Sequence, residues 1–346
     1  MQYVKLGPTG LEVSAICIGA MSYGEPARGH PYWSLPEPES RAMIRHALDL
    51  GINFFDTANM YSQGSSEEIL GRALKDFGNR DDLVVCTKVR HEMRSGPNGR
   101  GLSRKAIMTE IDHSLKRLGM DYVDIYMIHR ADPQTPWEET LEALHDVVKA
   151  GKARYLGASS MMAWEFSKAL HLQRERGWAR FITLQNHYNL LAREEDKEMH
   201  PLCADWGVGT MIWSPLARGR LSRPWGEGTA RSQKDPYQGM LYAGTEEADR
   251  AVVGAVQAVA DARGVSMAQV AQAWLRRNPV VAAPIIGATK PHHIDDAVAA
   301  LNLTLTDDEA ARLEAPYTPR YDFQGVSDPK VIKEISERVG IRPADS

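Results

Sequence analysis

The stretch from Val123 to Ser159 reads VDIYMIHRADPQTPWEETLEALHDVVKAGKARYLGAS and contains the unit from which the fold is built. The apolar run at each end of this stretch predicts a buried strand. Between the two runs, Leu141, Leu144 and Val147 recur at the spacing of one helix face, and Gly151 follows where a helix would end. The stretch therefore predicts a strand, a helix and a second strand in succession.

The same unit repeats along the chain. Near-continuous apolar strands that alternate with helices indicate a sheet covered on both faces, and eight of them fit a closed (β/α)₈ TIM barrel. An open doubly wound sheet is the alternative, but no Gly-x-Gly-x-x-Gly motif follows the first strand. The candidate strands are Ser14 to Ala20, Asn53 to Thr57, Leu83 to Lys88, Val123 to His129, Ala153 to Ser159, Phe181 to Asn186, Val208 to Ser214 and Ala282 to Gly287.

Three segments lie outside the repeat and complete a single domain over residues 1–346. They are an N-terminal hairpin (1–13), a long Gly/Arg-rich loop after the seventh strand (Arg218 to Thr245) and a C-terminal tail (316–346), leaving 14–315 for the barrel. Capping-box spacing predicts two helix starts, at Ser65 to Glu68 and at Thr135 to Glu138, the second with Pro136 as the first helical residue.

Composition excludes several classes of protein. The apolar share of 43% and the charged share of 25% are those of a globular chain, and a net charge of -4 gives no positive field for nucleic acid. No apolar run is long enough to span a membrane and no signal pattern opens the chain, so we expect a cytoplasmic protein. Cys17, Cys86 and Cys203 lack metal-ligand spacing and are expected to be buried thiols.

Four polar residues stand where consecutive apolar runs stop. Asp56 ends the second predicted strand with Tyr61 five residues on, Lys88 ends the third, and His129 ends the fourth. In a barrel these ends share one mouth. An ammonium beside a phenol of pKa about 10 favours loss of the phenol proton, a carboxylate balances that ammonium, and an imidazole can orient a carbonyl by hydrogen bonding. The set suits proton transfer to a carbonyl oxygen.

Taken singly, each of these residues has a plainer interpretation. Asp56 and Lys88 could form a structural ion pair, His129 could be a hydrogen-bonded core histidine, and Tyr61 could be an amphipathic residue of the rim. Four matching residue types on three consecutive strand ends favour a catalytic site over this coincidence.

These residues carry a resemblance to the aldo-keto reductases over essentially the whole chain. Gly51-Ile-Asn-Phe-Phe-Asp56-Thr-Ala-Asn-Met-Tyr61 resembles the family's catalytic Asp and Tyr signature, and Thr87-Lys88 and Ile128-His129 resemble its Lys and His signatures. Phe55, Ser65-Ser-Glu-Glu68, Gly157-Ala-Ser-Ser160 and Ser214-Pro-Leu-Ala-Arg-Gly-Arg220 resemble the bacterial YajO-type and aryl-alcohol dehydrogenase-like branch.

The resemblance implies an enzyme that reduces an aldehyde or ketone reversibly with a nicotinamide cofactor. Tyr61 would be the acid, Lys88 and Asp56 would tune it, and His129 would orient the small-molecule carbonyl or alcohol, with no metal. Asp56, Ser159, Ser160 and Gln185 would lie at the nicotinamide and Trp213 would stack on it. Ser160 stands where many members have Asn.

Phosphate groups are expected to bind in the loops after strands seven and eight, where barrels commonly hold them. The first loop offers Ser214, Leu216, Arg218 and Gly219, and the second offers Gly287, Thr289 and Lys290 before a helix. By resemblance, His293 takes the place of an Arg that grips the 2′-phosphate in many members, and Asp296 is placed for the adenine. Lys290 and Arg218 still favour NADP(H), with NAD(H) as the alternative.

Substrate contacts are expected from aromatic and polar residues near the mouth. A bulky aryl, polycyclic or quinone-like carbonyl would suit them, although the tail aromatics could simply anchor the loop. The candidates are Tyr32, Trp33, Met60, His91, Arg130 and Trp225, with Tyr321 and Phe323 in the tail.

Two other functions compete with a reductase. Potassium channel β-subunits also resemble this family and would use a bound nucleotide to sense redox state, but no added N-terminal arm precedes the hairpin. A metal-dependent barrel hydrolase could recruit Asp56, His91, His129, His187 and the pair His292-His293. It lacks a His-x-His motif on the first strand, and Lys88 occupies a strand end where a ligand would help.

Overall fold

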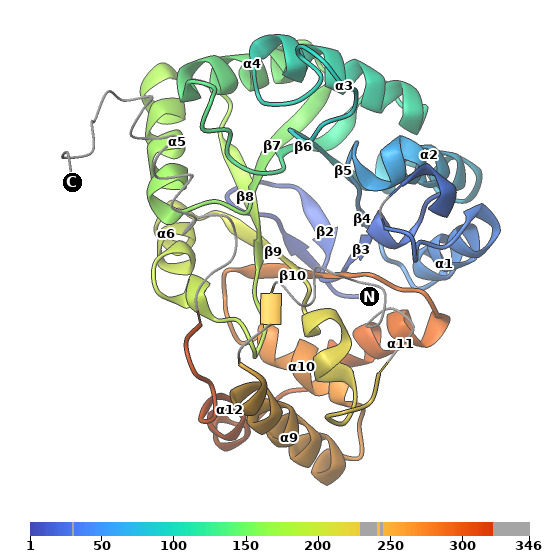
Figure 1. Cartoon of the computed structure of the whole chain (residues 1–346), viewed down its shortest axis with the longest axis vertical. Coiled ribbons are helices and arrows are strands. Elements are labelled where there is room, and N and C mark those ends of the chain that lie inside the picture. The colour runs from blue at the N-terminus through green and yellow to red at the C-terminus, as the bar shows by residue number, and fades with distance from the viewer. Residues whose placement is uncertain (30, 229–240, 243–244, 321–346) are drawn as a thin grey trace.

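The predicted barrel is confirmed in a computed structural model, which describes residues 1–29, 31–228, 241–242 and 245–320. Eight parallel strands close on themselves in the order β10-β3-β4-β5-β6-β7-β8-β9 (Figure 1). Their bounds are β3 (Cys17–Gly19), β4 (Phe54–Asp56), β5 (Val84–Val89), β6 (Val123–Ile128), β7 (Ala153–Ser159), β8 (Phe181–His187), β9 (Gly209–Trp213) and β10 (Val281–Ile286).

Helices surround the strands, as Figure 1 shows. Helices α9 and α12 pack on each other, while α10 and α11 pack against β10. The helices are α1 (Glu37–Asp49), α2 (Ser65–Phe77), α3 (Arg104–Leu118), α4 (Trp137–Lys149), α5 (Ala163–Arg176), α6 (Met199–Trp206), α9 (Glu246–Arg263), α10 (Met267–Leu275), α11 (Pro291–Ala300) and α12 (Asp307–Glu314). Short 3₁₀ turns connect them, at η1 (Ala20–Ser22), η2 (Pro26–Arg28), η3 (Tyr61–Gly64), η4 (Arg80–Asp82), η5 (Glu194–Asp196) and η6 (Ala217–Ser222).

The register of the strands brings their polar ends to one rim. Asp56 of β4 lies beside Cys86 of β5, and Lys88 of β5 lies beside Met127 of β6. On the other side of the barrel Ser159 of β7 lies beside Gln185 of β8. Because parallel strands all end on the same face, side chains from distant parts of the sequence meet there.

The predicted hairpin closes the opposite end of the barrel. Strands β1 (Tyr3–Lys5) and β2 (Glu12–Ser14) pair antiparallel. Leu6, which follows β1, and Val13 of β2 are fully buried and pack with Phe54 in the barrel interior. Gly7 has φ +58°, and a Cβ there would lie 2.1 Å from the Ile182 carbonyl oxygen, so only glycine fits this approach.

Three local predictions are wrong. The first barrel strand starts at Cys17 rather than Ser14, because Ser14 pairs with Tyr3 in the hairpin. Helix α2 has Gly64 at its N-cap, in the left-handed region, and the Ser65 hydroxyl instead donates to the Ser62 carbonyl. Helix α4 has Pro136 at its N-cap, and the Thr135 hydroxyl donates to Asp132. Neither capping box forms, because each hydroxyl donates to a group of the preceding loop.

The predicted end of α4 is confirmed, with Gly151 at φ +73° after the last turn.

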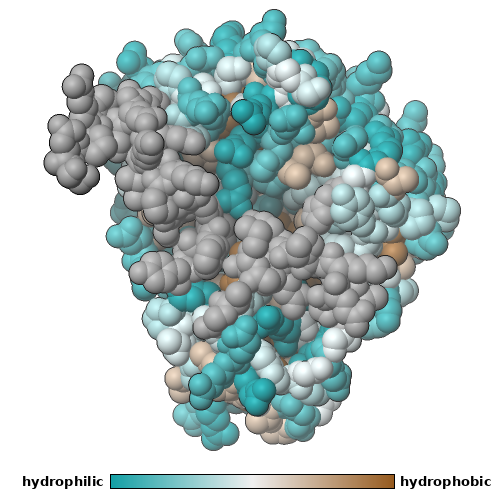
Figure 2. Space-filling model, in the orientation of Figure 1, coloured by the Kyte–Doolittle hydropathy of each residue, from teal (hydrophilic) through white to brown (hydrophobic). Residues whose placement is uncertain are grey.

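The described surface is mostly hydrophilic on the face seen in Figure 2, with apolar residues in small separate spots. All three cysteines are buried, as expected. Within the described ranges, every helix is too short or too polar to cross a membrane.

Candidate active site

A buried ion pair anchors the site at the ends of β4 and β5. The Lys88 ammonium donates to Asp56 Oδ2 at 2.6 Å and to the Thr57 carbonyl at 2.8 Å, and it lies 3.3 Å from the Tyr61 hydroxyl. Lys88 is fully buried, and Asp56 and Tyr61 are 2% and 9% exposed. Three of the four residues predicted to be catalytic are therefore in direct hydrogen-bonding contact.

Burial and charge act against each other in this group. Burial alone would lower the pKa of Lys88, but Asp56, together with Tyr61 and Cys86, raises it by more, so Lys88 stays protonated. Burial raises the pKa of Tyr61, and Lys88 opposes that rise. The expected effect of Lys88 on Tyr61 is thus present, but burial is the larger effect and Tyr61 stays protonated at neutral pH.

His129, the fourth predicted catalytic residue, follows β6 and faces Tyr61. Its ring centroid lies 5.8 Å from that of Tyr61 and 4.7 Å from that of His91, edge-on to both. Burial, then the charge of Lys88, holds the pKa of His129 well below its usual range, so the imidazole is neutral. Its Nδ1 atom is buried and has no hydrogen-bond partner among the described residues. A neutral ring has one N–H, and it can donate to one acceptor in the site.

Tyr61 begins a strained turn. Ser62 and Gln63, which follow it in η3, have φ values of 45° and 49°. Residues other than glycine rarely adopt this left-handed region, and such strain tends to gather where a side chain must be aimed. The turn carries the chain from the tyrosine into α2.

One cavity of about 910 Å³ joins the predicted sites. Asp56, Tyr61 and His129 line one side of it, and Lys88 lies behind them. All the residues predicted to bind the cofactor line the same cavity: Asp56, Ser159, Ser160, Gln185, Trp213, Ser214, Leu216, Arg218, Gly219, Gly287, Thr289, Lys290, His293 and Asp296.

The ends of β7, β8 and β9 place hydroxyl, amide and indole groups on the cavity wall. The Gln185 amide donates to Asp56 Oδ1 at 3.0 Å, which ties this group to the ion pair. The Trp213 indole N–H donates to Ser160 Oγ at 3.2 Å, and Ser160 Oγ lies 3.2 Å from Ser159 Oγ. Ser160 has φ +46°, so its hydroxyl is held on a strained backbone.

The connection after β9 has a run of left-handed residues. Ser214, Ala217, Arg218 and Gly219 have φ values of 54°, 47°, 56° and 99°. Backbone in such a conformation can form a concave surface that suits anions. The Ala217 and Gly219 N–H groups, however, donate to the Ser214 and Leu216 carbonyls within the loop.

The second predicted phosphate loop leads into α11. The Thr289 backbone N–H donates to His293 Nδ1 at 3.2 Å, which fixes that nitrogen as an acceptor. Burial, then His292 and Lys290, lowers the pKa of His293 to about 4. His293 is therefore neutral at pH 7 and supplies no charge. Asp296 accepts from Ser266 Oγ at 3.1 Å and from Gln269 Nε2 at 2.7 Å, so it is already partnered within the fold.

Sequence reasoning missed Arg223, which lines the cavity four residues after Gly219. Its Nη2 donates to Ser222 Oγ at 3.2 Å, and a Cβ built on Gly219 would meet the same nitrogen at 3.2 Å. Among the described residues neither Arg223 nor Lys290 has a carboxylate partner. The Gly/Arg-rich composition of the loop was the signal, but it did not distinguish Arg223 from Arg220, which pairs with Asp249. Met21 of η1 was also missed, and it too lines the cavity.

The predicted substrate residues divide into two groups. Trp33, Met60, His91 and Arg130 line the cavity. Tyr32 is 71% exposed and Trp225 lies against Arg220 and Arg250, and neither is among the described residues of the cavity wall. Tyr321 and Phe323 lie outside the described residues, as does most of the predicted tail and part of the loop from Arg218 to Thr245.

The residues proposed for a hydrolase site do not gather as metal ligands. In the described part of the chain there is no group of three or more His, Cys, Asp or Glu side chains that could hold a metal ion. His187 stacks on Trp213 instead, and His292 lies edge-on to His293.

Comparison with known proteins gives one family and many relatives. The model of the family described as "Aldo/keto reductase family" matches residues 15–317. Versiconal hemiacetal acetate reductase of Aspergillus parasiticus is 44% identical over 341 residues, covering 92% of this chain and 98% of its own length. Aldo-keto reductase AMT2 of Alternaria alternata is 39% identical, covering 91% of both chains. Putative aryl-alcohol dehydrogenase AAD16 of Saccharomyces cerevisiae is 37% identical, covering 92% of this chain and 98% of its own. These relatives agree with an aryl-alcohol dehydrogenase-like branch, but they are fungal and do not support the expected bacterial origin of that branch.

Proposed function

Because this chain belongs to the aldo/keto reductase family, we propose that it reduces an aldehyde or ketone to an alcohol with NADPH, and that Tyr61 is its general acid. The family and the reductases among its relatives make the chain an NAD(P)H-dependent oxidoreductase. The observation that carries the finer proposal is the position of Tyr61 in the cavity wall, with its hydroxyl 3.3 Å from the buried Lys88 ammonium.

The residues of the cavity fit a nicotinamide dinucleotide. Near the ion pair, the Ser159 hydroxyl and the Gln185 amide supply polar groups for a carboxamide, and the Trp213 indole supplies a flat apolar face. Away from it, the N-terminus of α11 and the loop after β9, in which Ser214, Ala217, Arg218 and Gly219 are left-handed, suit phosphate groups. The bound cofactor would supply a hydride to the carbonyl carbon.

The chain's own residues handle the proton. Tyr61 is protonated at rest and can give its proton to the carbonyl oxygen as negative charge develops there. Lys88 favours the resulting phenolate, and Asp56 keeps Lys88 charged in a buried position. His129, held neutral, can donate a hydrogen bond that orients the same oxygen. In the reverse direction the Tyr61 phenolate would take the proton back from the alcohol.

The preference for NADPH over NADH rests on cations that line the cavity. Lys290 precedes α11 and Arg218 belongs to the left-handed loop, and Arg223 adds a third positive charge to the same cavity. Because His293 is neutral, the charge that faces a 2′-phosphate comes from these three residues rather than from His293.

The substrate proposed is a carbonyl compound with an aryl or other bulky group. Trp33 and Met60 add apolar groups to the cavity wall, while Arg130 and His91, which lies edge-on to His129, add polar groups. One relative is named for an aryl alcohol and another for a hemiacetal acetate, both larger than a simple aliphatic aldehyde.

The experiment is a turnover assay that follows oxidation of NADPH with aryl aldehydes, bulky ketones and short aliphatic aldehydes. The proposal expects turnover that is fastest with aryl or bulky carbonyls and is slower with NADH. Absence of turnover with every carbonyl, although NADPH binds, would contradict it and favour a nucleotide-binding role.

A further inference from the structure

The Trp213 indole has a second aromatic ring behind it. The His187 imidazole lies parallel to the indole, with ring centroids 4.3 Å apart and an angle of 12° between the planes. Trp213 lines the cavity, whereas His187 is not among the described residues of the cavity wall. The indole is therefore held between the cavity on one face and the imidazole on the other.

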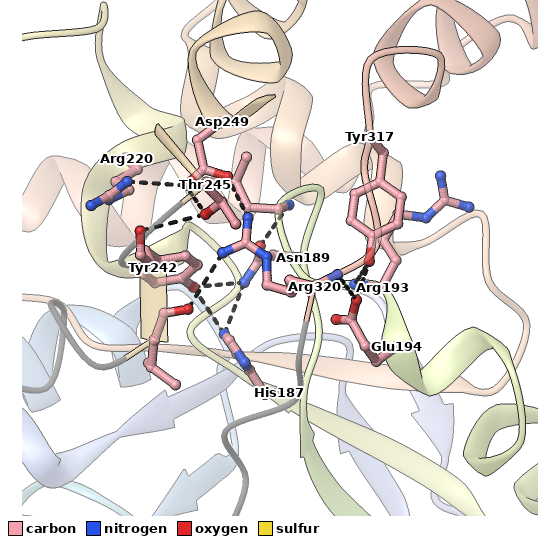
Figure 3. Close-up of polar contacts among 12 residues, drawn as sticks. His187, Asn189, Arg193, Glu194, Arg220, Tyr242, Thr245, Asp249, Tyr317 and Arg320 are labelled. Atoms are coloured by element: carbon pink, nitrogen blue, oxygen red, sulfur yellow. Dashed lines mark hydrogen bonds and ion pairs between the residues drawn. The ribbon is translucent and has the colours of Figure 1, made fainter. Parts of the chain in front are cut away.

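Hydrogen bonds fix the orientation of the imidazole. Its Nε2 atom lies 2.9 Å from the Tyr242 hydroxyl, and Asn189 Nδ2 lies 3.2 Å from that same hydroxyl (Figure 3). Asn189 Nδ2 also donates to the Ser214 carbonyl at 3.0 Å. Asn189 Nδ2 also lies 3.2 Å from His187 Nε2, so the amide and the hydroxyl both meet the imidazole at that one nitrogen. Burial lowers the pKa of His187 to about 3, so the ring is neutral at pH 7.

Tyr242 is held in turn by two arginines that share one carboxylate. The guanidinium groups of Arg220 and Arg320 lie 5.1 Å and 5.2 Å from the centroid of the Tyr242 ring. Both pair with Asp249, which is 1% exposed (Figure 3). Arg220 comes from the connection after β9 and Arg320 follows α12, so two distant segments meet behind the indole.

Arg320 is anchored at a second point. Its backbone N–H donates to Glu194 Oε1 at 2.9 Å, and the Tyr317 hydroxyl donates to the same carboxylate. The Tyr317 hydroxyl also accepts from the Arg193 backbone N–H at 3.2 Å. The chain after α12 is thus tied to the connection after β8, and Tyr242 is supported by a fixed framework.

We propose that His187 is a positioning residue that sets the plane of the Trp213 indole for the cofactor. This inference rests on the proposed function, in which Trp213 contacts the nicotinamide. A flat ring offers its full face to a ligand only if it cannot tilt, and an aromatic ring stacked on its far face opposes that tilt. The hydrogen bond from Trp213 to Ser160 holds one edge of the indole, and His187 holds the face.

The experiment is a titration of protein fluorescence with NADPH on His187→Ala and His187→Phe. His187→Ala opens space behind the indole, so we expect NADPH affinity to fall about 3- to 10-fold and the quenching of Trp213 emission to weaken. His187→Phe keeps a ring in the stack and should recover most of that affinity. Trp213→Phe identifies which part of the emission belongs to Trp213.

The matched control is His200→Ala. His200 is also buried and contacts the amide side chains of Asn186 and Asn278 and the Asp196 carboxylate. Its ring lies edge-on to Tyr188, and it is not stacked on the indole. Its loss should lower the melting temperature as much as the loss of His187, with NADPH affinity unchanged. Equal NADPH affinity in His187→Ala and His200→Ala would overturn the proposal.

If His187→Ala does not fold, Tyr242→Phe takes its place, since it removes only the hydroxyl that bonds to His187. Weaker NADPH binding and altered quenching are then expected, and unchanged binding would overturn the inference. Failure of the proposed function itself looks different, because wild-type protein would then show neither NADPH binding nor carbonyl turnover.

Discussion

The two ends of the cavity are built in different ways. At the proposed catalytic end, Asp56 and Lys88 stand on adjacent strands and Tyr61 follows the first of them, and the Lys88 ammonium lies 2.6 Å from Asp56 and 3.3 Å from the Tyr61 hydroxyl. At the other end, Arg223 and Lys290 stand on connections, and neither has a carboxylate partner among the described residues. The first end is assembled before any ligand arrives, and the second supplies positive charge for an anion. Substitutions at the first end should therefore change rate, and those at the second should change affinity.

The largest effect expected is from Tyr61→Phe. The ring stays and only the proton donor is lost, so reduction should slow by about 10² to 10⁴-fold in kcat while NADPH affinity stays near that of wild type. Steady-state kinetics and a binding titration measure the two quantities. Tyr126→Phe is the control, because Tyr126 is a fully buried tyrosine of β6 that does not line the cavity. Near-normal kcat in Tyr61→Phe would remove Tyr61 from the mechanism.

The next effect expected is from Lys88→Met, with a loss of about 10²-fold in kcat near neutral pH. Lys88 lowers the pKa of Tyr61 against the effect of burial. Its removal should therefore move the pH profile of alcohol oxidation, which needs the phenolate, to higher pH. The variant leaves Asp56 buried and unpaired, so it should also unfold more easily.

Adding Asp56→Asn to Lys88→Met removes that unpaired charge and should restore part of the stability without restoring the rate. A pH profile of oxidation that does not move in Lys88→Met would mean that Lys88 has only a structural role.

The third effect tests the nucleotide end. Lys290→Ala and Arg223→Ala should each weaken NADPH binding by about 10- to 150-fold and leave NADH binding nearly unchanged, since only NADPH carries the 2′-phosphate. The preference of wild type for NADPH should also shrink as salt is raised. Arg250→Ala is the control, because Arg250 lies against Trp225 and is not among the described residues of the cavity wall. Equal binding of NADH and NADPH by wild type at low salt would refute the 2′-phosphate assignment.

The smallest effect expected is on the pH dependence of the free energy of unfolding, and it is tested at one histidine from each end of the cavity, His91 and His293. Burial, together with neighbouring cations, lowers the pKa of both His91 and His293 to about 4. The unfolded chain binds protons on these rings below about pH 6.5 and the folded chain does not, so the free energy of unfolding should fall as pH drops from about 6.5 to 4. His91→Gln and His293→Gln should each reduce this dependence, as measured by denaturant unfolding at several pH values. If the free energy of unfolding depends on pH in both variants as it does in wild type, the lowered pKa values of His91 and His293 would be contradicted.

The convergence of residues at the proposed catalytic end could be predicted from the sequence because strands fix the direction of their side chains. Once Asp56, Lys88 and His129 are assigned to consecutive strand ends, the closed barrel brings them together whatever the connections do. The barrel itself was predictable for the same reason, since its strands are short apolar runs with a regular spacing. The sequence also indicated that a buried Lys88 would need the Asp56 carboxylate as its counter-charge. It could not show that burial affects the pKa of Tyr61 more than the charge of Lys88 does.

The connections could not be predicted in the same way, because their backbone depends on partners far along the chain. Arg220 and Arg223 belong to one short segment, yet Arg220 turns to Asp249 and Arg223 lines the cavity. Composition placed Trp225 at the mouth, whereas it packs beside Arg220 and Arg250. Ser65 and Thr135 had the right spacing for capping boxes, but loop carbonyl and carboxylate groups nearer in space took their hydroxyls.

The left-handed turn after Tyr61 sets a direction for laboratory evolution of this protein. A non-glycine residue in that region costs about 1 to 2 kcal/mol, so Gln63→Gly removes strain from the folded state and is a natural product of selection for heat resistance. Glycine would also free the backbone that aims the tyrosine. Selection for heat resistance and selection for turnover should therefore choose different residues at position 63, and a library varied there would show how far one property must be given up for the other.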